Sequence, residues 1–188
     1  MNNDYYELDI VGLKRELPIC KISDDLSIAG FVIFGDVELT KRCAEAMNKI
    51  MPEHDIMITA ESKGIPLIYE LARQQNADHY LIARKSVKLY MKDPKGVEVH
   101  SITTAKKQEL FIDAKDVELM RDKKVVIIDD VISTGESLRA IEKLVATAGG
   151  TVVARMAILA EGDAKYRDDI KCLGWIPLLD GDGKPMEH

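Results

Sequence analysis

The stretch VVIIDDVISTGESL, residues 125–138, runs four apolar residues into two adjacent carboxylates and then into a turn of small residues. Such an apolar run predicts a short buried strand that ends at Asp129 and Asp130. Carboxylates are costly to remove from water, and they add nothing to a hydrophobic core. We therefore expect the reason for both acids to be functional and to lie in the residues that follow.

The turn after the two acids has the features of an anion site. It consists of Ser133, Thr134, Gly135, Glu136 and Ser137, between the predicted strand and a predicted helix. Backbone N–H groups at the start of a helix lack intrahelical partners, and the helix dipole favours an anion there. An ordinary helix cap is the alternative interpretation. Together, the acids and the turn suit a phosphorylated sugar, because carboxylates accept hydrogen bonds from a vicinal diol.

Length and composition favour a single domain spanning residues 1–188. No apolar run is long enough to span a bilayer, and the first ten residues, MNNDYYELDI, do not form a basic-then-apolar leader, so we expect no membrane partner. The three cysteines lie far apart, which indicates neither a disulfide framework nor a zinc site. These features predict a cytoplasmic protein.

Charge is unevenly distributed along the chain. The formal net charge of -6 argues against nucleic acid as a partner, because nonspecific affinity for nucleic acid comes mostly from excess Lys and Arg. Residues 84–107 nevertheless contain seven basic side chains and only two acidic ones. A solvated face is the ordinary interpretation of such a run, but it also suits a compact polyanionic ligand.

Short apolar strands alternate with amphipathic helices along most of the chain. Strands are predicted at residues 56–60, 80–83, 125–128 and 151–159, and helices at 37–51, 66–76 and 137–148. Nearly continuous apolar strands are typical of a parallel sheet covered on both faces, so the predicted fold class is α/β. Ligands of such sheets bind beyond the carboxyl ends of the strands. We therefore expect ESKG, ARK and DDVISTGES, which each follow a strand, to meet in one crevice.

One segment, residues 86–112, does not fit the alternation. VEVHSI and ELFI are predicted to be extended arms around the polar stretch TTAKKQ, which indicates a hairpin with a flexible tip. Because its basic residues attract an anion, we expect residues 88–107 to close over a bound ligand.

Four of these motifs resemble those of a known family. VVIIDDVISTGES resembles the phosphoribosyl pyrophosphate motif of type I phosphoribosyltransferases. TAESKGIP is similar to the pyrophosphate loop of the adenine and archaeal hypoxanthine enzymes, ARKSVKL to their basic segment, and GFVIFGDVEL to the base-binding segment of adenine enzymes. The similarity covers residues 30–162. It implies a mainly parallel twisted sheet flanked by helices, a small hood of amino-terminal and carboxy-terminal segments, and a flexible hairpin loop.

The resemblance implies a purine phosphoribosyltransferase of purine salvage that acts as a homodimer. Such an enzyme transfers the 5-phosphoribosyl group from phosphoribosyl pyrophosphate to a purine base, with magnesium held mainly by the donor. Adenine is expected ahead of hypoxanthine or guanine. Two departures from adenine enzymes are Gly135-Glu136-Ser137 in place of their usual Gly-Gly-Thr, and residues 101–106, SITTAK, in place of a Tyr-x-x-Glu-Tyr-Gly type sequence. The second departure weakens the adenine assignment, and AEGD at residues 160–163 is closer to the E-R-G-D of archaeal hypoxanthine enzymes, so the base stays open.

The implied roles of the donor-binding residues follow the motifs. Asp129 and Asp130 would hold the ribose hydroxyls and stabilise positive charge at the anomeric carbon, while residues 133–137 bind the 5-phosphate. The pyrophosphate would lie against backbone donors of the second loop, next to a cis peptide bond between Glu61 and Ser62. The residues of that loop are Ser62, Lys63 and Gly64.

Two further groups of residues take their roles from the resemblance. The departing pyrophosphate would be neutralised, commonly across a dimer interface, by Arg84, Lys85 and Lys88. Phe34 would lie against the purine, and the backbone at Ile33 and Gly35 would read its edge.

A noncatalytic regulator that senses phosphoribosyl pyrophosphate is the alternative from another functional class. Such regulators normally have an added DNA-binding domain. The residues before Gly30 show no helix-turn-helix pattern and no excess of basic charge, which favours the enzyme.

Overall fold

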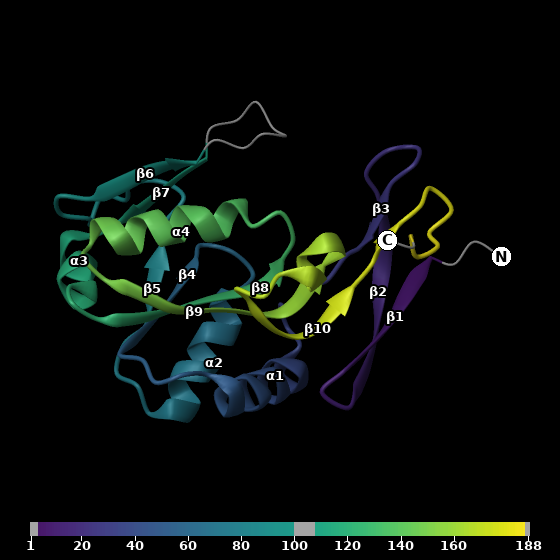
Figure 1. Ribbon diagram of the computed structural model, residues 1–188, viewed down its shortest axis with the longest axis horizontal. Helices are drawn as coiled ribbons and strands as arrows, with labels where there is room; N and C mark the ends of the chain where they lie inside the picture. The colour runs from purple at the N-terminus through teal and green to yellow at the C-terminus, as the bar shows by residue number, and fades with distance from the viewer. Residues whose placement is uncertain (1–3, 100–107, 187–188) are drawn as a thin grey trace.

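A five-stranded sheet forms the body of the protein in the computed structural model, which describes residues 4–99 and 108–186 (Figure 1). All neighbouring strands in this sheet run parallel. Their order is β10 (Lys171–Ile176), β9 (Thr151–Glu161), β8 (Lys124–Ile132), β4 (Ile56–Ala60) and β5 (Leu81–Ala83). The predicted α/β class with a mainly parallel sheet is therefore confirmed.

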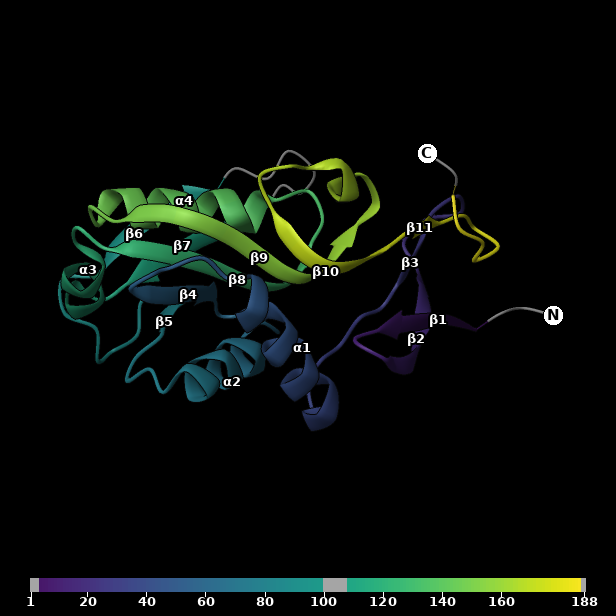
Figure 2. The same ribbon diagram turned by 60° about the horizontal axis from the view of Figure 1, so that its bottom comes forward.

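Helices cover both faces of the sheet (Figure 2). One face carries α1 (Val37–Ile50) and α2 (Ile65–Gln75), and the other carries α4 (Glu136–Thr147). Successive side chains of a strand point to opposite faces. In β8, Val126 and Ile128 accordingly pack in the cluster with α1 and α2, whereas Val125 and Ile127 pack in the cluster with α4. The four apolar residues near the start of β8, residues 125–128, thus join two hydrophobic cores.

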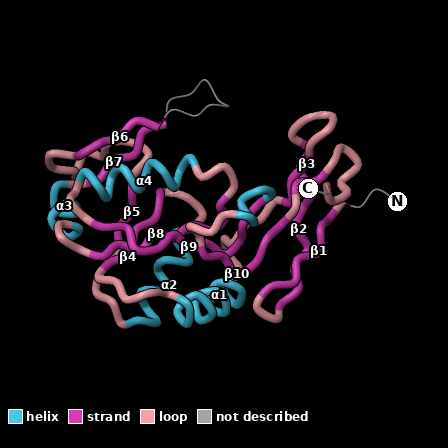
Figure 3. Tube along the Cα trace, in the orientation of Figure 1, coloured by secondary structure: helices cyan, strands magenta, loops and turns pink. Residues whose placement is uncertain are grey.

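A second sheet joins the two ends of the chain into a hood beside the main sheet (Figure 3). Its neighbouring strands are antiparallel. In order they are β1 (Tyr5–Ile10), β2 (Leu13–Lys21), β3 (Ser27–Ala29) and β11 (Leu178–Leu179). This arrangement matches the expected amino-terminal and carboxy-terminal hood.

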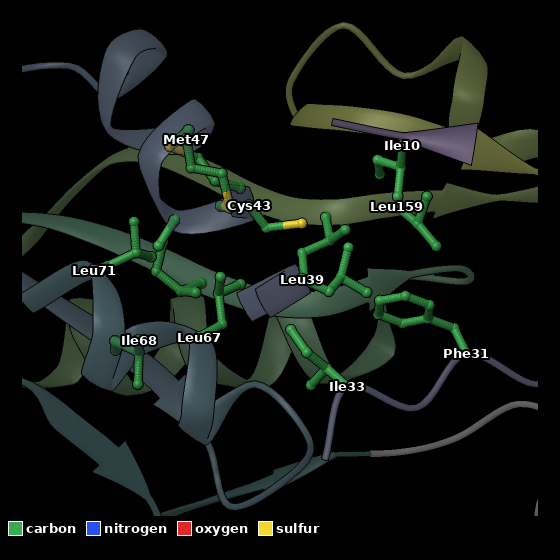
Figure 4. Packing of buried hydrophobic residues seen from close by; sticks show 14 of the residues in the cluster. Ile10, Phe31, Ile33, Leu39, Cys43, Met47, Leu67, Ile68, Leu71 and Leu159 are labelled. Carbon is green, nitrogen blue, oxygen red and sulfur yellow. The ribbon is translucent and has the colours of Figure 1, made fainter. Parts of the chain in front are cut away.

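The hood shares a hydrophobic core with α1 and α2. Ile10 and Phe31 belong to the same buried cluster as Leu39 and Met47 of α1 and Leu67 of α2 (Figure 4). Burial of such side chains is the main favourable term in folding. The chain segment that leads from the hood into α1 is therefore fixed against the main sheet.

The predicted hairpin is present as β6 (Lys95–Val99) paired antiparallel with β7 (Gln108–Ile112). Its predicted flexible tip lies outside the described residues. The short helix α3 (Ala114–Met120) connects the hairpin to β8. None of the helices in the described part of the chain is long and apolar enough to cross a membrane.

The prediction that the third strand ends at residue 128 is wrong, because β8 continues to Ile132 and includes both acids. Its partner β9 extends to Glu161, so Asp129 pairs with Ala157 and Val131 with Leu159. The backbone partners offered by β9 therefore outweigh the local preference of Asp for turns.

An ion pair connects the hood to α1. The Arg15 guanidinium on β2 binds Asp36 through Nε at 2.6 Å and Glu38 through Nη2 at 3.0 Å. Asp36 also caps α1, because its Oδ1 accepts a hydrogen bond from the Leu39 N–H at 3.0 Å. The Arg15 hydrogen bond holds the pKa of Asp36 below its ordinary value. One carboxylate therefore both starts the helix and fixes the hood.

We predict that Asp36→Ala lowers the free energy of unfolding by about 1–2 kcal/mol, since it removes a helix cap and a partly buried ion pair together. Asp36→Asn is the matched control, because Asn caps helices well but has no charge. It should lose less than half as much stability in urea titrations. Equal stability of Asp36→Ala and the wild type would contradict the assigned role of Asp36.

Candidate active site

The loops after β4, β5 and β8 meet beyond the carboxyl ends of these strands, as the sequence predicts. They border a cavity of about 390 Å³, which the hood segment at Gly30 and Phe31 also lines. Seven of the predicted site residues line this cavity: Ser62, Lys63, Lys85, Asp129, Asp130, Ser133 and Ser137. These seven residues, from Ser62 to Ser137, thus come from separate parts of the chain and share one crevice.

The two acids form a close, desolvated pair. The side chain of Asp130 is only 6% exposed, and its backbone N–H donates a hydrogen bond to Asp129 Oδ1 at 2.9 Å. Burial raises the pKa of Asp129 well above its ordinary value, and the neighbouring Asp130 carboxylate raises it further. The pair therefore holds unfavourable negative charge that a ligand with hydroxyl donors or a cation would relieve.

Lys63 compensates part of this charge from the loop after β4. Its Nζ lies 3.1 Å from Asp130 Oδ2 and also donates a hydrogen bond to the Phe31 carbonyl oxygen at 2.6 Å. One ammonium group thus links the acid pair to the hood segment that lines the same cavity. Sequence reasoning missed this link, because nothing in the local pattern brings residue 63 close to residue 31.

Gly64 allows the loop after β4 to approach the acid pair. A Cβ atom at this position would lie 2.6 Å from Thr59 Oγ1 and 3.5 Å from the Asp129 Cα. Any side chain would therefore clash with Thr59 of β4 and force the loop to shift, so glycine is required for the close approach.

The prediction of a cis peptide bond between Glu61 and Ser62 is wrong, because the described residues contain no cis peptide bond. In the trans form, the Glu61 N–H donates to the Ala83 carbonyl and the Ser62 N–H donates to the Ala60 carbonyl, each at 2.8 Å. These two hydrogen bonds fix the start of the loop in the trans geometry.

The three predicted basic residues meet at Glu61. Arg84 Nη2 lies 3.0 Å from Glu61 Oε1, and Lys88 Nζ lies 3.7 Å from Oε2. The Lys85 N–H donates a hydrogen bond to the same carboxylate at 2.9 Å, and this bond, with help from Arg84, holds the pKa of Glu61 below its ordinary value. Glu61 therefore organises the basic segment, a role that sequence reasoning missed although the acid directly follows β4.

The turn after β8 starts α4 without a side-chain cap. Gly135 is the N-cap residue with φ of 77°, and it has no side chain to cap the helix. The ordinary-cap interpretation is thus wrong for this helix, and the dipole at its start favours an anion. A Cβ atom at Gly135 would clash with Nη1 of Arg167. The Arg167 side chain is fixed because its Nε and Nη2 donate hydrogen bonds to Asp169 at 2.9 and 2.8 Å.

The residues predicted to bind the base do not line this cavity. Ile33 is fully buried, Phe34 is 56% exposed, and Ile33 and Gly35 border a separate pocket between α1 and α2. The hood presents Gly30 and Phe31 to the acids instead, because the chain turns into α1 at residue 36. The base-binding role of Ile33, Phe34 and Gly35 stays a prediction.

A divalent cation could be held only with help from a ligand. Among residues 4–99 and 108–186, no three His, Cys, Asp or Glu side chains are grouped to hold a metal ion. Two carboxylates in one crevice nevertheless fit magnesium, which usually takes one or two protein carboxylates together with substrate phosphates and water.

Comparison with known proteins agrees with this geometry. The family model described as "Phosphoribosyl transferase domain" matches residues 37–176. The chain is 31% identical over 146 residues to the hypoxanthine/guanine phosphoribosyltransferase of Methanocaldococcus vulcanius, covering 73% of this chain and 70% of that protein. It is 33% identical over 141 residues to the enzyme of the same name from Methanococcus vannielii, covering 71% of each. The adenine phosphoribosyltransferase structure from Thermoanaerobacter pseudethanolicus has the same fold, with a TM-score of 0.66 at 21% identity over 92% of this chain and 96% of that one.

We predict that Asp129→Asn makes the protein more stable than the wild type at neutral pH, with no such gain in acid. The folded-state pKa of Asp129 is raised above its ordinary value of about 3.9, so the wild type binds more protons when folded. Its stability is therefore complete below that pH and falls as the pH rises through the raised pKa. Asn cannot ionise and avoids this loss. Thermal melts between roughly pH 4 and pH 8 test the sign, and a pH-independent difference would contradict it.

Proposed function

Because the chain belongs to the phosphoribosyl transferase domain family, we propose that it transfers the 5-phosphoribosyl group of phosphoribosyl pyrophosphate to a ring nitrogen of a purine. The observation that carries this proposal is the adjacent pair Asp129–Asp130, which shares one cavity with the uncapped start of α4. The products are a nucleoside monophosphate and pyrophosphate, so the protein is an enzyme of purine salvage.

The acid pair serves the ribose in this reaction. The carboxylates of Asp129 and Asp130 accept hydrogen bonds from the two ribose hydroxyls, and Lys63 must release Asp130 Oδ2 for this to happen. As the bond from the anomeric carbon to pyrophosphate breaks, positive charge develops on the sugar. The negative charge of the pair then stabilises the transition state more than the ground state. A new bond from the purine nitrogen to the anomeric carbon completes the transfer, and the proton of the purine passes to the released pyrophosphate or to water.

The two phosphate ends of the donor fit the two loops. The 5-phosphate accepts hydrogen bonds from N–H groups of residues 133–137, where Ser133 and Ser137 border the cavity. The pyrophosphate lies against residues 62–64, and the basic residues Arg84, Lys85 and Lys88 stabilise it as it leaves. Magnesium, when bound, neutralises pyrophosphate charge, with the donor supplying most of its oxygen ligands.

A homodimer fits the surface after β5. The side chains of Val87, Leu89 and Tyr90 are 51%, 108% and 62% exposed and lie among the basic residues of this segment. Exposed apolar side chains that cluster in this way favour a protein contact. A second copy seated there would lie next to Arg84 and Lys88.

Two candidate bases have different support. Adenine is the acceptor expected from the segment at residues 30–39, and the adenine phosphoribosyltransferase structures share the fold. Hypoxanthine or guanine is the second candidate, because the relatives with 31% and 33% identity have that name. Both candidates are purines, and both place the ring between the hood and the acid pair.

We predict that the protein, mixed with phosphoribosyl pyrophosphate and magnesium, releases one pyrophosphate for each nucleoside monophosphate formed with adenine, hypoxanthine or guanine. Xanthine completes the set of acceptors in the same assay. Binding of the donor without transfer to any of these bases would contradict the enzyme and favour a sensor of the donor.

We also predict that Asp129→Asn and Asp130→Asn each lower kcat by at least about a hundredfold while the fold survives, since the pair acts on transition-state charge. Asp55→Asn is the matched control. Its carboxylate accepts a hydrogen bond from the Lys124 N–H at the opposite end of β8, 2.7 Å away, so kcat should stay unchanged. Steady-state rates of the three variants measure kcat, and thermal melts show whether each variant keeps its fold. Wild-type turnover in both acid-pair variants would remove the ribose-binding role.

A further inference from the structure

Thr59 is a buried polar residue without a partner. It lies in β4, where the other four residues of IMITA are apolar, and its side chain is fully buried. Its Oγ1 has no hydrogen-bond partner among the described residues. A buried hydroxyl that makes no hydrogen bond destabilises the folded state, and valine would fill nearly the same space without this cost. The hydroxyl therefore needs a reason that the fold alone does not supply.

The hydroxyl lies directly beneath the loop after β4. In this strand Ile58 and Ala60 pack toward α4, so Thr59 points to the opposite face, at the start of α2. A Cβ atom on Gly64 would lie 2.6 Å from Thr59 Oγ1 and 3.6 Å from Asp129 Oδ1. Thr59 Oγ1 is thus in contact range of the loop backbone, at the junction between the loop and the acid pair.

Beyond the Ser62 N–H, the backbone of this loop is held by two long hydrogen bonds. The Gly64 N–H donates to Ser62 Oγ at 3.4 Å, and the Ile65 N–H donates to the Ser62 carbonyl, also at 3.4 Å. Bonds of this length are weak compared with the usual 2.9 Å. In addition, α2 starts without a side-chain cap, and Pro66 has no N–H to donate. Rotation of the peptide between Lys63 and Gly64 therefore breaks one long bond and brings a backbone group to Thr59 Oγ1, while the Ser62 N–H keeps its 2.8 Å bond to the Ala60 carbonyl.

We propose that Thr59 is a positioning residue for pyrophosphate: its hydroxyl hydrogen-bonds to the backbone of residues 62–64 when that loop turns its N–H groups toward the anion. The inference rests on the proposed function, in which this loop holds pyrophosphate. The orphaned hydroxyl destabilises only the anion-free loop, because the rotated loop satisfies it. Because the unpartnered hydroxyl raises the free energy of the anion-free state alone, it increases the affinity of the loop for the anion.

The test compares Thr59→Val with Thr59→Ser. Thr59→Val should raise Tm by roughly 2–4 °C, since it removes an unsatisfied hydroxyl. It should also weaken the binding of magnesium pyrophosphate about tenfold, since it removes a hydrogen bond of the bound state. Thr59→Ser keeps the hydroxyl and should retain wild-type affinity, although its lost methyl lowers Tm. Calorimetric titration with magnesium pyrophosphate and thermal melts give both readouts.

Thr40→Val is the matched control, because Thr40 is also buried but its hydroxyl donates to the Asp36 carbonyl at 2.7 Å. It should lower Tm and leave pyrophosphate binding unchanged. Ribose 5-phosphate, which occupies the loop of residues 133–137, should bind Thr59→Val as it binds the wild type.

An unchanged or lower Tm of Thr59→Val would overturn the inference, and so would unchanged affinity for pyrophosphate. In either case, a wild type that binds pyrophosphate leaves the proposed function standing. A wild type that binds no magnesium pyrophosphate would overturn the proposed function and this inference together.

Discussion

Two adjacent carboxylates near the carboxyl end of the central strand, one half-buried and one buried, are the constraint on which the rest of the site depends. β8 lies between β9 and β4, so Asp129 and Asp130 emerge where the loops of its neighbours converge. Burial and mutual repulsion make the pair unfavourable in the free protein, as the raised pKa of Asp129 indicates. Lys63 offsets part of that cost, and through the Phe31 carbonyl it ties the pair to the hood.

The remainder of the fold supplies the stability that this edge lacks. Two hydrophobic clusters pack on opposite faces of the same strand, and they fix β8 along its length. The locally unfavourable features gather at the carboxyl edge: the acid pair, the unpartnered hydroxyl of Thr59 and the uncapped start of α4. Natural proteins violate local rules at functional sites and compensate elsewhere. The gathering of these unfavourable features at one edge therefore agrees with the proposed binding of phosphoribosyl pyrophosphate there.

Much of this architecture could be predicted from the sequence, because the apolar run of residues 125–128 and the period of the helices are local patterns. The convergence of three loops followed from the rule for parallel sheets. Contacts between distant segments were not predictable: the partner strand β9 extends β8 past Asp129, Glu61 gathers the basic residues, and Lys63 reaches the hood. Likewise, no local pattern tells which residue of the segment from the hood to α1 faces the cavity.

A crystal structure of the protein with ribose 5-phosphate tests the central claim most directly. The account predicts that both ribose hydroxyls lie within hydrogen-bond distance of Asp129 and Asp130, that the phosphate lies on the N–H groups of residues 133–137, and that Lys63 has left Asp130. A sugar phosphate bound elsewhere, or bound here while Lys63 still occupies Asp130, would contradict it.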